Sequence, residues 1–179
     1  MAGQNPHRVD PIAEARRQWH VHGWDDAAAG MTAVTSVMRA QQLMQASVDA
    51  ALKPHKLTFA RYEMLRMLAF TRAGRLPLAS AIDRLQVHPT SVTNTVDRLV
   101  KDGYIERVKH PADGRAAMLL LTDVGRAVVE EATVSLNSEV FERVGMNHAD
   151  TTALVAIVAR FREGSGDFVN DPEATRDPD

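Results

Sequence analysis

Short hydroxyl and amide side chains cover one face of the segment PTSVTNTVDRLVKD, residues 89–102, where a surface helix usually carries Glu and Lys. Proline suits the first turn of a helix and glycine its left-handed end, so Pro89 and Gly103 predict a helix between them. At helical spacing, the apolar residues share one face: Val92, Val96, Leu99 and Val100. The opposite face is polar and becomes basic toward its end: Thr90, Ser91, Thr93, Asn94, Asp97, Arg98 and Lys101.

This polar face has the chemistry of a helix that enters the major groove of DNA. Ser, Thr and Asn are short enough to let the helix approach base edges, and they both donate and accept hydrogen bonds. The amide groups at a helix N-terminus also attract phosphate oxygens. The alternative is that Ser and Thr only cap and decorate a surface helix, and the helix alone does not decide between the two.

A basic hairpin is expected directly after this helix, over residues 105–121. The segment YIERVK alternates, with Ile105 and Val108 as its strongest apolar members, the Asp-Gly pair at 113–114 favours a tight turn, and AAMLLLT is the returning strand. Four basic residues lie on or near the hairpin: Arg107, Lys109, His110 and Arg115. Taken alone it fits a solvated hairpin, but after a helix-turn-helix it indicates a wing that reaches the minor groove or the DNA backbone.

Helices are predicted on both sides of these two elements. Asp10 and Pro11 begin a short helix that ends near Gly23, and Pro54 stops a long helix over residues 25–53. The remaining predicted elements are a helix after Thr58 that ends near Gly74, a short edge strand in RLPL, a helix at 78–85, a turn at 86–88, and helices at 123–145 and 147–163. This order predicts a mainly α fold with a small β-wing, a winged helix-turn-helix flanked by helices.

Composition excludes several kinds of protein. The chain has 179 residues, 45% hydrophobic, which permits a core, and it has no Cys, which rules out disulfides, thiol redox sensing and Cys-based zinc sites. Because no apolar run reaches 18 residues and the first residues lack the apolar core of a signal peptide, we expect a cytoplasmic protein without a membrane span. A phosphate-binding glycine loop, HExxH and Gly-x-Ser-x-Gly are missing, so we expect neither an enzyme nor a bound cofactor.

The net charge of −2 is unevenly distributed along the chain. After Gly166, five carboxylates face one arginine, so this tail carries −4 and the remainder carries +2 by difference. Its Pro- and Asp-rich composition predicts a disordered acidic tail over residues 165–179. The rest of the chain is therefore compatible with a nucleic-acid partner.

The segments LTFARYEMLRML and VHPTSVTNTVDRLVKDGYIERVKHPADGRAAMLLLTDVGR resemble the MarR family of winged-helix transcription regulators. The likeness extends from about Met31 to Phe161, and VDRLVKDGYIERV, DGR and LTDVGR match the family's recognition-helix, wing and following motifs in order and spacing. It implies a homodimer with N- and C-terminal dimerisation helices. The implied regions are an N-terminal extension at 1–24, a dimerisation region at 25–54 and 123–164, and a DNA-binding domain at 55–122.

The resemblance also implies which residues contact DNA. Together with the two lysines at the ends of the helix and of the first wing strand, the expected set is Thr90, Ser91, Thr93, Asn94, Arg98, Lys101, Lys109, Asp113 and Arg115. The resemblance implies that Arg115 reaches the groove and that Asp113 orients it or braces the wing. The chain departs from the family at the wing tip, where Gly114 replaces the first arginine of the usual pair.

A regulator of this family is implied to bind a pseudo-palindromic operator, usually as a repressor. A small effector, phenolic or another lipophilic anion, would shift the two recognition helices away from one helical turn of DNA, about 34 Å. A competing interpretation is a winged-helix module that binds protein and has lost DNA binding, which Gly114 and the acidic net charge keep open.

The N-terminal extension holds both tryptophans of the chain. One interpretation is a clasp that buries aromatic area against the partner subunit. The other is an effector pocket for an anionic aromatic ligand or a coenzyme A thioester, with Arg16, Trp19, His20 and Trp24 as its candidates. His20 and His22 alone do not make a metal site, and no metal is expected. The methionines of the long helix, Met31, Met38 and Met44, are expected in a core or a dimer interface.

Overall fold

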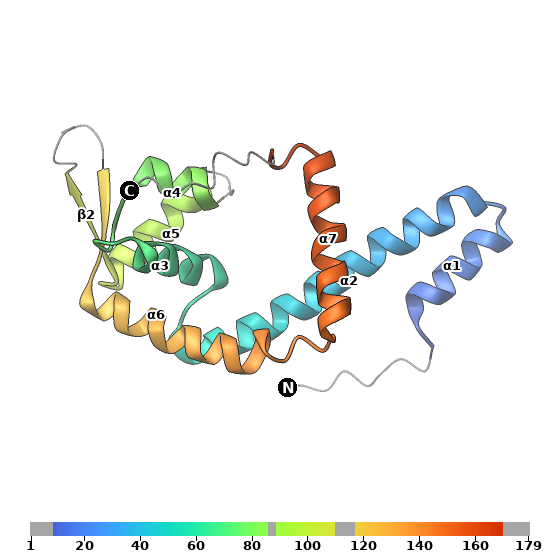
Figure 1. Ribbon diagram of the computed structural model, residues 1–179, viewed down its shortest axis with the longest axis horizontal. Coiled ribbons are helices and arrows are strands. Elements are labelled where there is room, and N and C mark those ends of the chain that lie inside the picture. Colours follow the sequence, from blue (N-terminus) through green and yellow to red (C-terminus); the bar gives the residue numbers. More distant parts are fainter. Residues whose placement is uncertain (1–8, 86–88, 110–116, 170–179) are drawn as a thin grey trace. The chain divides into compact units, whose positions relative to one another are not determined.

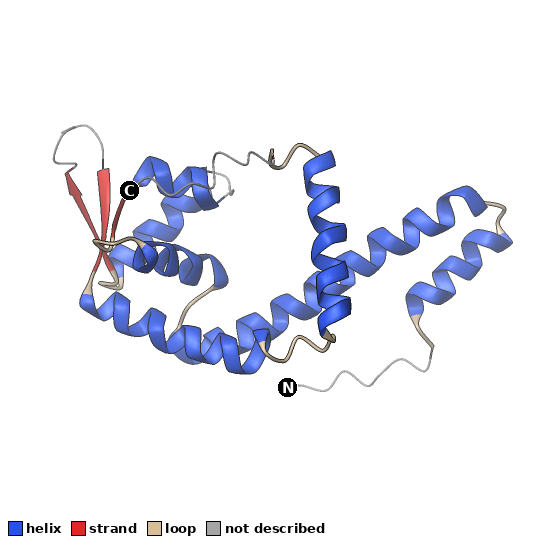
Figure 2. Ribbon diagram, in the orientation of Figure 1, coloured by secondary structure: helices blue, strands red, loops and turns tan. Residues whose placement is uncertain are grey.

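The computed structural model describes residues 9–85, 89–109 and 117–169 and is mainly helical with a small antiparallel sheet (Figures 1 and 2). The chain separates into two compact units, residues 1–140 and residues 141–179. Within the described residues, none of the helices is both long and apolar enough to cross a membrane. The mainly α fold with a β-wing predicted from the sequence is confirmed.

The first unit begins with the two predicted N-terminal helices. Helix α1 (Pro11–Val21) starts at Asp10, whose carboxylate accepts a hydrogen bond from the Ile12 amide at 3.0 Å. After the turn at Gly23, helix α2 (Asp25–Leu52) runs back beside α1 (Figure 1). Pro54 lies in the short 3₁₀ turn η1 (Lys53–His55), so α2 ends where the proline predicted it would.

The winged helix-turn-helix follows in the expected order. Its elements are α3 (Phe59–Phe70), β1 (Arg75–Pro77), α4 (Leu78–Leu85), α5 (Pro89–Lys101), β2 (Ile105–Lys109) and β3 (Ala117–Leu121). The sheet order is β1-β3-β2, all antiparallel, which confirms the short edge strand. Helix α3 ends at Phe70, earlier than predicted, because Thr71 adopts an extended conformation and Gly74, at a φ of +62°, belongs to the turn into β1. The predicted turn at 86–88 lies outside the described residues.

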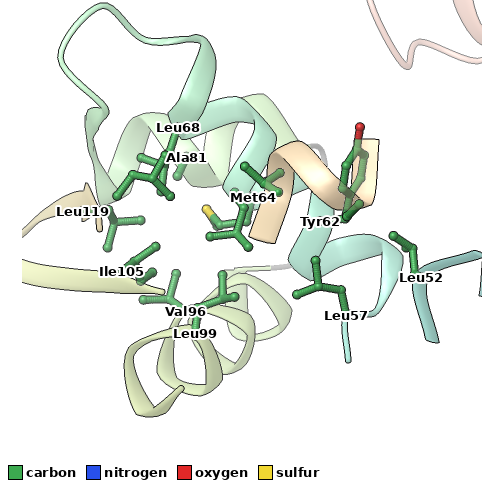
Figure 3. Close-up of a cluster of buried hydrophobic side chains, with 14 of the residues drawn as sticks. Leu52, Leu57, Tyr62, Met64, Leu68, Ala81, Val96, Leu99, Ile105 and Leu119 are labelled. Carbon is green, nitrogen blue, oxygen red and sulfur yellow. The ribbon is translucent and has the colours of Figure 1, made fainter. Parts of the chain in front are cut away.

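A continuous apolar core joins these elements, as Figure 3 shows for ten labelled side chains. They come from α2, α3, α4, α5, β2, β3 and the α2–α3 loop: Leu52, Leu57, Tyr62, Met64, Leu68, Ala81, Val96, Leu99, Ile105 and Leu119. Because the buried face of α5 packs directly into this core, its opposite face must point to solvent.

Two apolar residues of α5 and β2 are partly exposed, and one of them, Val100, was expected on the buried face of its helix. Val100 is 38% exposed and Val108 is 39% exposed. Each helical residue is rotated by about 100° from the last, so Val100 lies at the edge of the face that Leu99 buries. Strand side chains alternate, so Val108 and Ile105, three positions apart, point to opposite sides of the sheet.

The helix after the wing is shorter than predicted. Helix α6 (Asp123–Leu136) begins at Thr122, whose hydroxyl accepts from the Gly125 amide at 3.0 Å, as expected. A π-helical turn, η2 (Asn137–Phe141), then replaces the continuation to residue 145. The Ser138 hydroxyl donates to the Val134 carbonyl at 2.9 Å and competes there with the helical backbone pattern. In the second unit, α7 (His148–Gly164) begins at Asn147, as predicted.

The large apolar side chains of α2 are buried only near its C-terminal end. Val48 is 8% exposed and Leu52 is fully buried, whereas Val34 and Val37 are each 60% exposed and Met38 is 59% exposed. Helix α7 also carries large exposed apolar residues, Val155, Ile157 and Phe161. A single chain therefore leaves much apolar surface uncovered on these helices.

Candidate nucleic-acid interface

Helix α5 presents a polar and basic face to solvent. Val92, Val96 and Leu99 are fully buried against the core. Asp97 is exposed on this helix, and so are five residues of the predicted DNA-binding set: Ser91, Thr93, Asn94, Arg98 and Lys101. The side chain of Thr90, and the whole of Asp113 and Arg115, lie outside the described part of the chain.

The two wing strands place the basic wing next to α5. Lys109 is exposed at the end of β2 and pairs in register with Ala117, so the predicted tip lies between these two residues. His110 also falls in that stretch, outside the described residues. Because β2 follows α5 after only three residues and packs against it, the first wing strand lies next to the recognition helix.

Arg107 is engaged within the protein. Its guanidinium forms an ion pair with Asp97 of α5, with 2.9 Å between Arg107 Nη2 and Asp97 Oδ1. Both side chains are partly exposed, so the pair contributes little to the free energy of unfolding. The ion pair does link β2 to α5. It also neutralises the charge of Arg107, one of the basic residues assigned to the wing.

A polar depression of about 260 Å³ opens beside the exposed face of α5. It is lined by Thr58, Arg61, Ser91, Asn94, Thr95 and Arg98. Ser91, Asn94 and Arg98 were expected at the interface, whereas Thr58, Arg61 and Thr95 were not. From the sequence, Thr58 could be recognised only as the residue that caps a helix. It does cap α3, since its hydroxyl accepts a hydrogen bond from the Arg61 amide.

Arg61 forms the most enclosed cationic group of this depression. Its side chain is 12% exposed and pairs with Asp102, and Nη1 donates to the Lys56 carbonyl at 3.0 Å. The guanidinium carbon lies 5.9 Å from the centre of the Tyr104 ring. Its Nε atom is buried without a hydrogen-bond partner. Arg61 thus connects the beginning of α3 to the turn that follows α5.

Aromatic residues gather at the α1–α2 turn. The Trp19 and Trp24 rings meet edge to face at 5.4 Å, and His22 stacks on Trp24 at 5.3 Å. His20 Nδ1 lies 2.5 Å from Asp25 Oδ1, and Arg16 is exposed. Among the described residues, no group of three or more His, Asp or Glu side chains is arranged to hold a metal ion.

A second depression, about 450 Å³, lies elsewhere between α1 and α2. Its lining consists of Asp10, Pro11, Ile12, Thr35, Met38, Arg39 and Gln42. None of the four predicted effector residues belongs to it. The structure therefore brings Trp19 and Trp24 together, but outside this cavity.

Comparisons with known proteins agree with this geometry. A family model described as MarR family matches residues 55–116. The MarR family transcriptional regulator Sco5413 of Streptomyces coelicolor is 44% identical, over 78% of this chain and 97% of that protein, with a TM-score of 0.70. BpsR of Bordetella bronchiseptica, whose DNA binding is regulated by 6-hydroxynicotinic acid, is 25% identical over 71% of this chain and 90% of its own, with a TM-score of 0.64.

A curated relative matches over a shorter region. The HTH-type transcriptional regulator BilQ of Clostridioides difficile is 35% identical over 81 residues, which is 45% of this chain and 53% of BilQ. The chain thus spans about half the length of the curated relatives that it matches first.

Proposed function

The chain belongs to the MarR family of transcriptional regulators, and from this premise we propose that it binds a pseudo-palindromic DNA operator as a homodimer and represses a neighbouring gene. The observation that carries the proposal is the exposed polar and basic face of α5 directly beside a two-stranded wing. Each subunit inserts one α5 into the major groove, because short hydroxyl and amide side chains there allow close approach to base edges.

The contacts divide by their chemistry. Ser91, Thr93 and Asn94, near the beginning of α5, face the bases, while Arg98 and Lys101 contact phosphates farther along. The wing, with Lys109 at its base, reaches the minor groove or the backbone through Arg115, which Asp113 orients. Thr90 completes the set at the first turn of the helix.

A small effector is proposed to release the DNA. BpsR supports the idea of ligand control, since 6-hydroxynicotinic acid regulates its DNA binding. For this chain we propose a phenolic or other lipophilic anion, or a coenzyme A thioester, near Arg16, Trp19, His20 and Trp24, where a cation and aromatic rings lie on one short segment.

The test of the DNA-binding proposal is a gel-shift and footprinting assay with the region upstream of the protein's own gene. We expect a protected, roughly symmetric site that survives an excess of unrelated duplex. Only unspecific binding, equal for both duplexes and lost with modest salt, would support the protein-binding module instead.

The effector proposal has a separate measurement. Because the chain has two tryptophans, both in this segment, ligand binding there should change their fluorescence and also dissociate the operator complex. Trp19→Phe should remove most of the fluorescence change and weaken the ligand's effect on DNA. A ligand that dissociates DNA while the fluorescence of both tryptophans stays constant binds elsewhere.

A further inference from the structure

We propose that the depression between the beginning of α3 and α5 seats one phosphate of the DNA backbone, with Arg98 as its contact and Arg61 as a positioning residue. The inference rests on the proposed DNA binding and adds an anchoring point to it. Thr58, Arg61 and Thr95 thereby join an interface for which only the polar face of α5 and the wing were expected.

The lining chemistry fits a phosphodiester. It consists of two guanidinium groups, the hydroxyls of Thr58, Ser91 and Thr95, and the amide of Asn94, with no carboxylate and no apolar side chain. A phosphodiester offers only acceptor oxygens and a negative charge, which hydroxyl, amide and guanidinium donors satisfy. Such a lining is a poor seat for an apolar or cationic group.

The two arginines have different surroundings. The Arg61 guanidinium is committed to Asp102 and to the Lys56 carbonyl, and its charge is compensated by that carboxylate. Arg98 is exposed and forms no ion pair with any residue in the described segments. Arg98 therefore supplies the uncompensated charge, whereas Arg61 fixes the wall against which the phosphate rests.

The location favours DNA over a free anion. Ser91, Asn94 and Arg98 belong both to the depression and to the face of α5 proposed to enter the major groove. When that face meets base edges, a strand of the backbone must pass beside the helix. A phosphate held there sets how deeply α5 enters the groove, and the Arg61–Asp102 pair keeps α3 and α5 in fixed register during this contact.

The experiment uses the full-length protein and the operator duplex defined by footprinting, with each phosphate in turn replaced by a neutral methylphosphonate. For the wild type we expect more than one sensitive position per half-site, since Lys101 and the wing are also proposed to contact the backbone. At the phosphate held by Arg98, neutralisation should weaken binding by roughly tenfold, the size of one good charged contact. In Arg98→Gln, the same methylphosphonate should cause almost no further loss of affinity, because the effects of removing the two partners of one contact are not additive. The salt slope of this variant should fall by about one unit per contact removed.

The matched control is Arg72→Gln, which removes one exposed positive charge at the other end of α3. This variant should keep the wild-type pattern of methylphosphonate sensitivity. If Arg98→Gln also keeps that pattern, Arg98 does not hold a phosphate in the depression and the inference is overturned.

Arg61→Lys tests the positioning role, since lysine keeps the positive charge but lacks the planar guanidinium that can donate to two partners at once. We expect a weaker or displaced sensitive position and a smaller ratio of operator to unspecific affinity. If Arg61 has only a structural role, Arg61→Lys should lower the melting temperature and leave the sensitive position unchanged. That result would contradict the positioning role of Arg61. Asp102→Asn removes the carboxylate that holds Arg61 and leaves its positive charge uncompensated, so it should also displace the sensitive position and should raise the unspecific affinity.

Two outcomes separate this inference from the proposed function. If the wild type forms no specific operator complex, DNA binding itself fails. If it forms one but no phosphate position depends on Arg98, the function stands and only the anchor fails. A last measurement uses inorganic phosphate and follows heat unfolding. If a low concentration of phosphate stabilises the wild type but not Arg98→Gln, and no DNA phosphate is sensitive, the depression binds a free anion and the proposal is overturned.

Discussion

At the scale of single residues, the availability of a basic side chain to DNA depends on its acidic neighbours. Arg107 and Arg98 lie on adjacent elements, and both are partly exposed. Arg107 is paired with Asp97, while Arg98 forms no ion pair within the described segments. We therefore assign the phosphate contact to Arg98 and a linking role to Arg107.

The wing tip provides a first residue-scale prediction. Arg115→Ala should weaken operator binding by about 1–3 kcal/mol, because Gly114 leaves Arg115 as the one arginine of the usual pair. Fluorescence anisotropy with a labelled operator measures the change, with Arg72→Ala as a control of equal charge. Equal affinities for Arg115→Ala and the wild type would remove Arg115 from the interface.

A glycine at the start of α6 provides a second. A Cβ added at Gly125 would lie 2.0 Å from the Tyr104 carbonyl oxygen and 3.0 Å from Leu121 Cδ1, so backbone would have to move. Gly125→Ala should therefore lower the free energy of unfolding by roughly 1–3 kcal/mol, the usual cost of overpacking. Urea unfolding followed by circular dichroism measures it. Gly164→Ala, where no neighbouring atom lies within 4 Å, should have a negligible effect.

At the scale of elements, one arginine attaches α3 to α6. Arg66 Nη2 donates to the Val129 carbonyl at 3.0 Å and to the Thr133 hydroxyl at 2.5 Å, and Nη1 reaches Glu130 at 3.0 Å. The Tyr62 hydroxyl lies 3.2 Å from the same Thr133 oxygen. These contacts fix the DNA-binding elements on the helix that leads to the second unit.

The two partners of that ion pair should differ in importance. Arg66→Met removes hydrogen bonds at a mostly buried position and should cost about 2 kcal/mol of unfolding free energy. Glu130→Gln should cost about 1 kcal/mol or less, since the Glu130 side chain is 57% exposed. Urea unfolding at neutral pH compares the two variants. Equal losses would mean that the ion pair, and not the backbone and hydroxyl contacts, carries the stabilisation.

The pH dependence of the same pair has a definite sign. The hydrogen bond from Arg66 lowers the pKa of Glu130 below its usual value of 4.5. A carboxyl with a lowered folded-state pKa stabilises the protein above its unfolded pKa and loses that contribution as the pH falls through the folded value. The difference in unfolding free energy between the wild type and Glu130→Gln should therefore shrink below about pH 4.5. A difference that grows on acidification would contradict this assignment.

At the scale of the whole molecule, apolar surface that a single chain cannot cover points to association. Val34, Val37 and Met38 lie on one stripe of α2, and each is more than half exposed. Monomeric proteins rarely expose such a continuous apolar patch. A homodimer would bury this stripe and would present two α5 helices to two operator half-sites.

This proposal predicts the effect of charge on the stripe. The double change Val34→Glu and Val37→Glu should convert a dimer to a folded monomer, because two buried carboxylates per subunit oppose the interface. Sedimentation equilibrium measures the mass, and circular dichroism checks the fold. Ser36→Glu, on another face of α2, should remain dimeric. A wild type that is monomeric at all concentrations would refute the dimer.

The sequence alone determined the features that depend on neighbours a few residues away. The buried side of α5 and the caps at Asp10, Thr58 and Thr122 follow from local periodicity and hydrogen bonding. The motif likeness added the family and the expected DNA-binding residues. All of these DNA contacts remain predictions, and the side chain of Thr90 as well as Asp113 and Arg115 lie outside the described residues.

Only the tertiary structure decided which distant residues meet. Arg61 and Asp102 are 41 positions apart, and their pairing depends on how α3 packs against the end of α5. The same packing places Thr58 and Thr95 in one depression, and the close approach of Tyr104 to α6 explains why residue 125 lacks a side chain. Periodicity predicts the face on which a side chain lies, but the partner of that side chain depends on long-range packing.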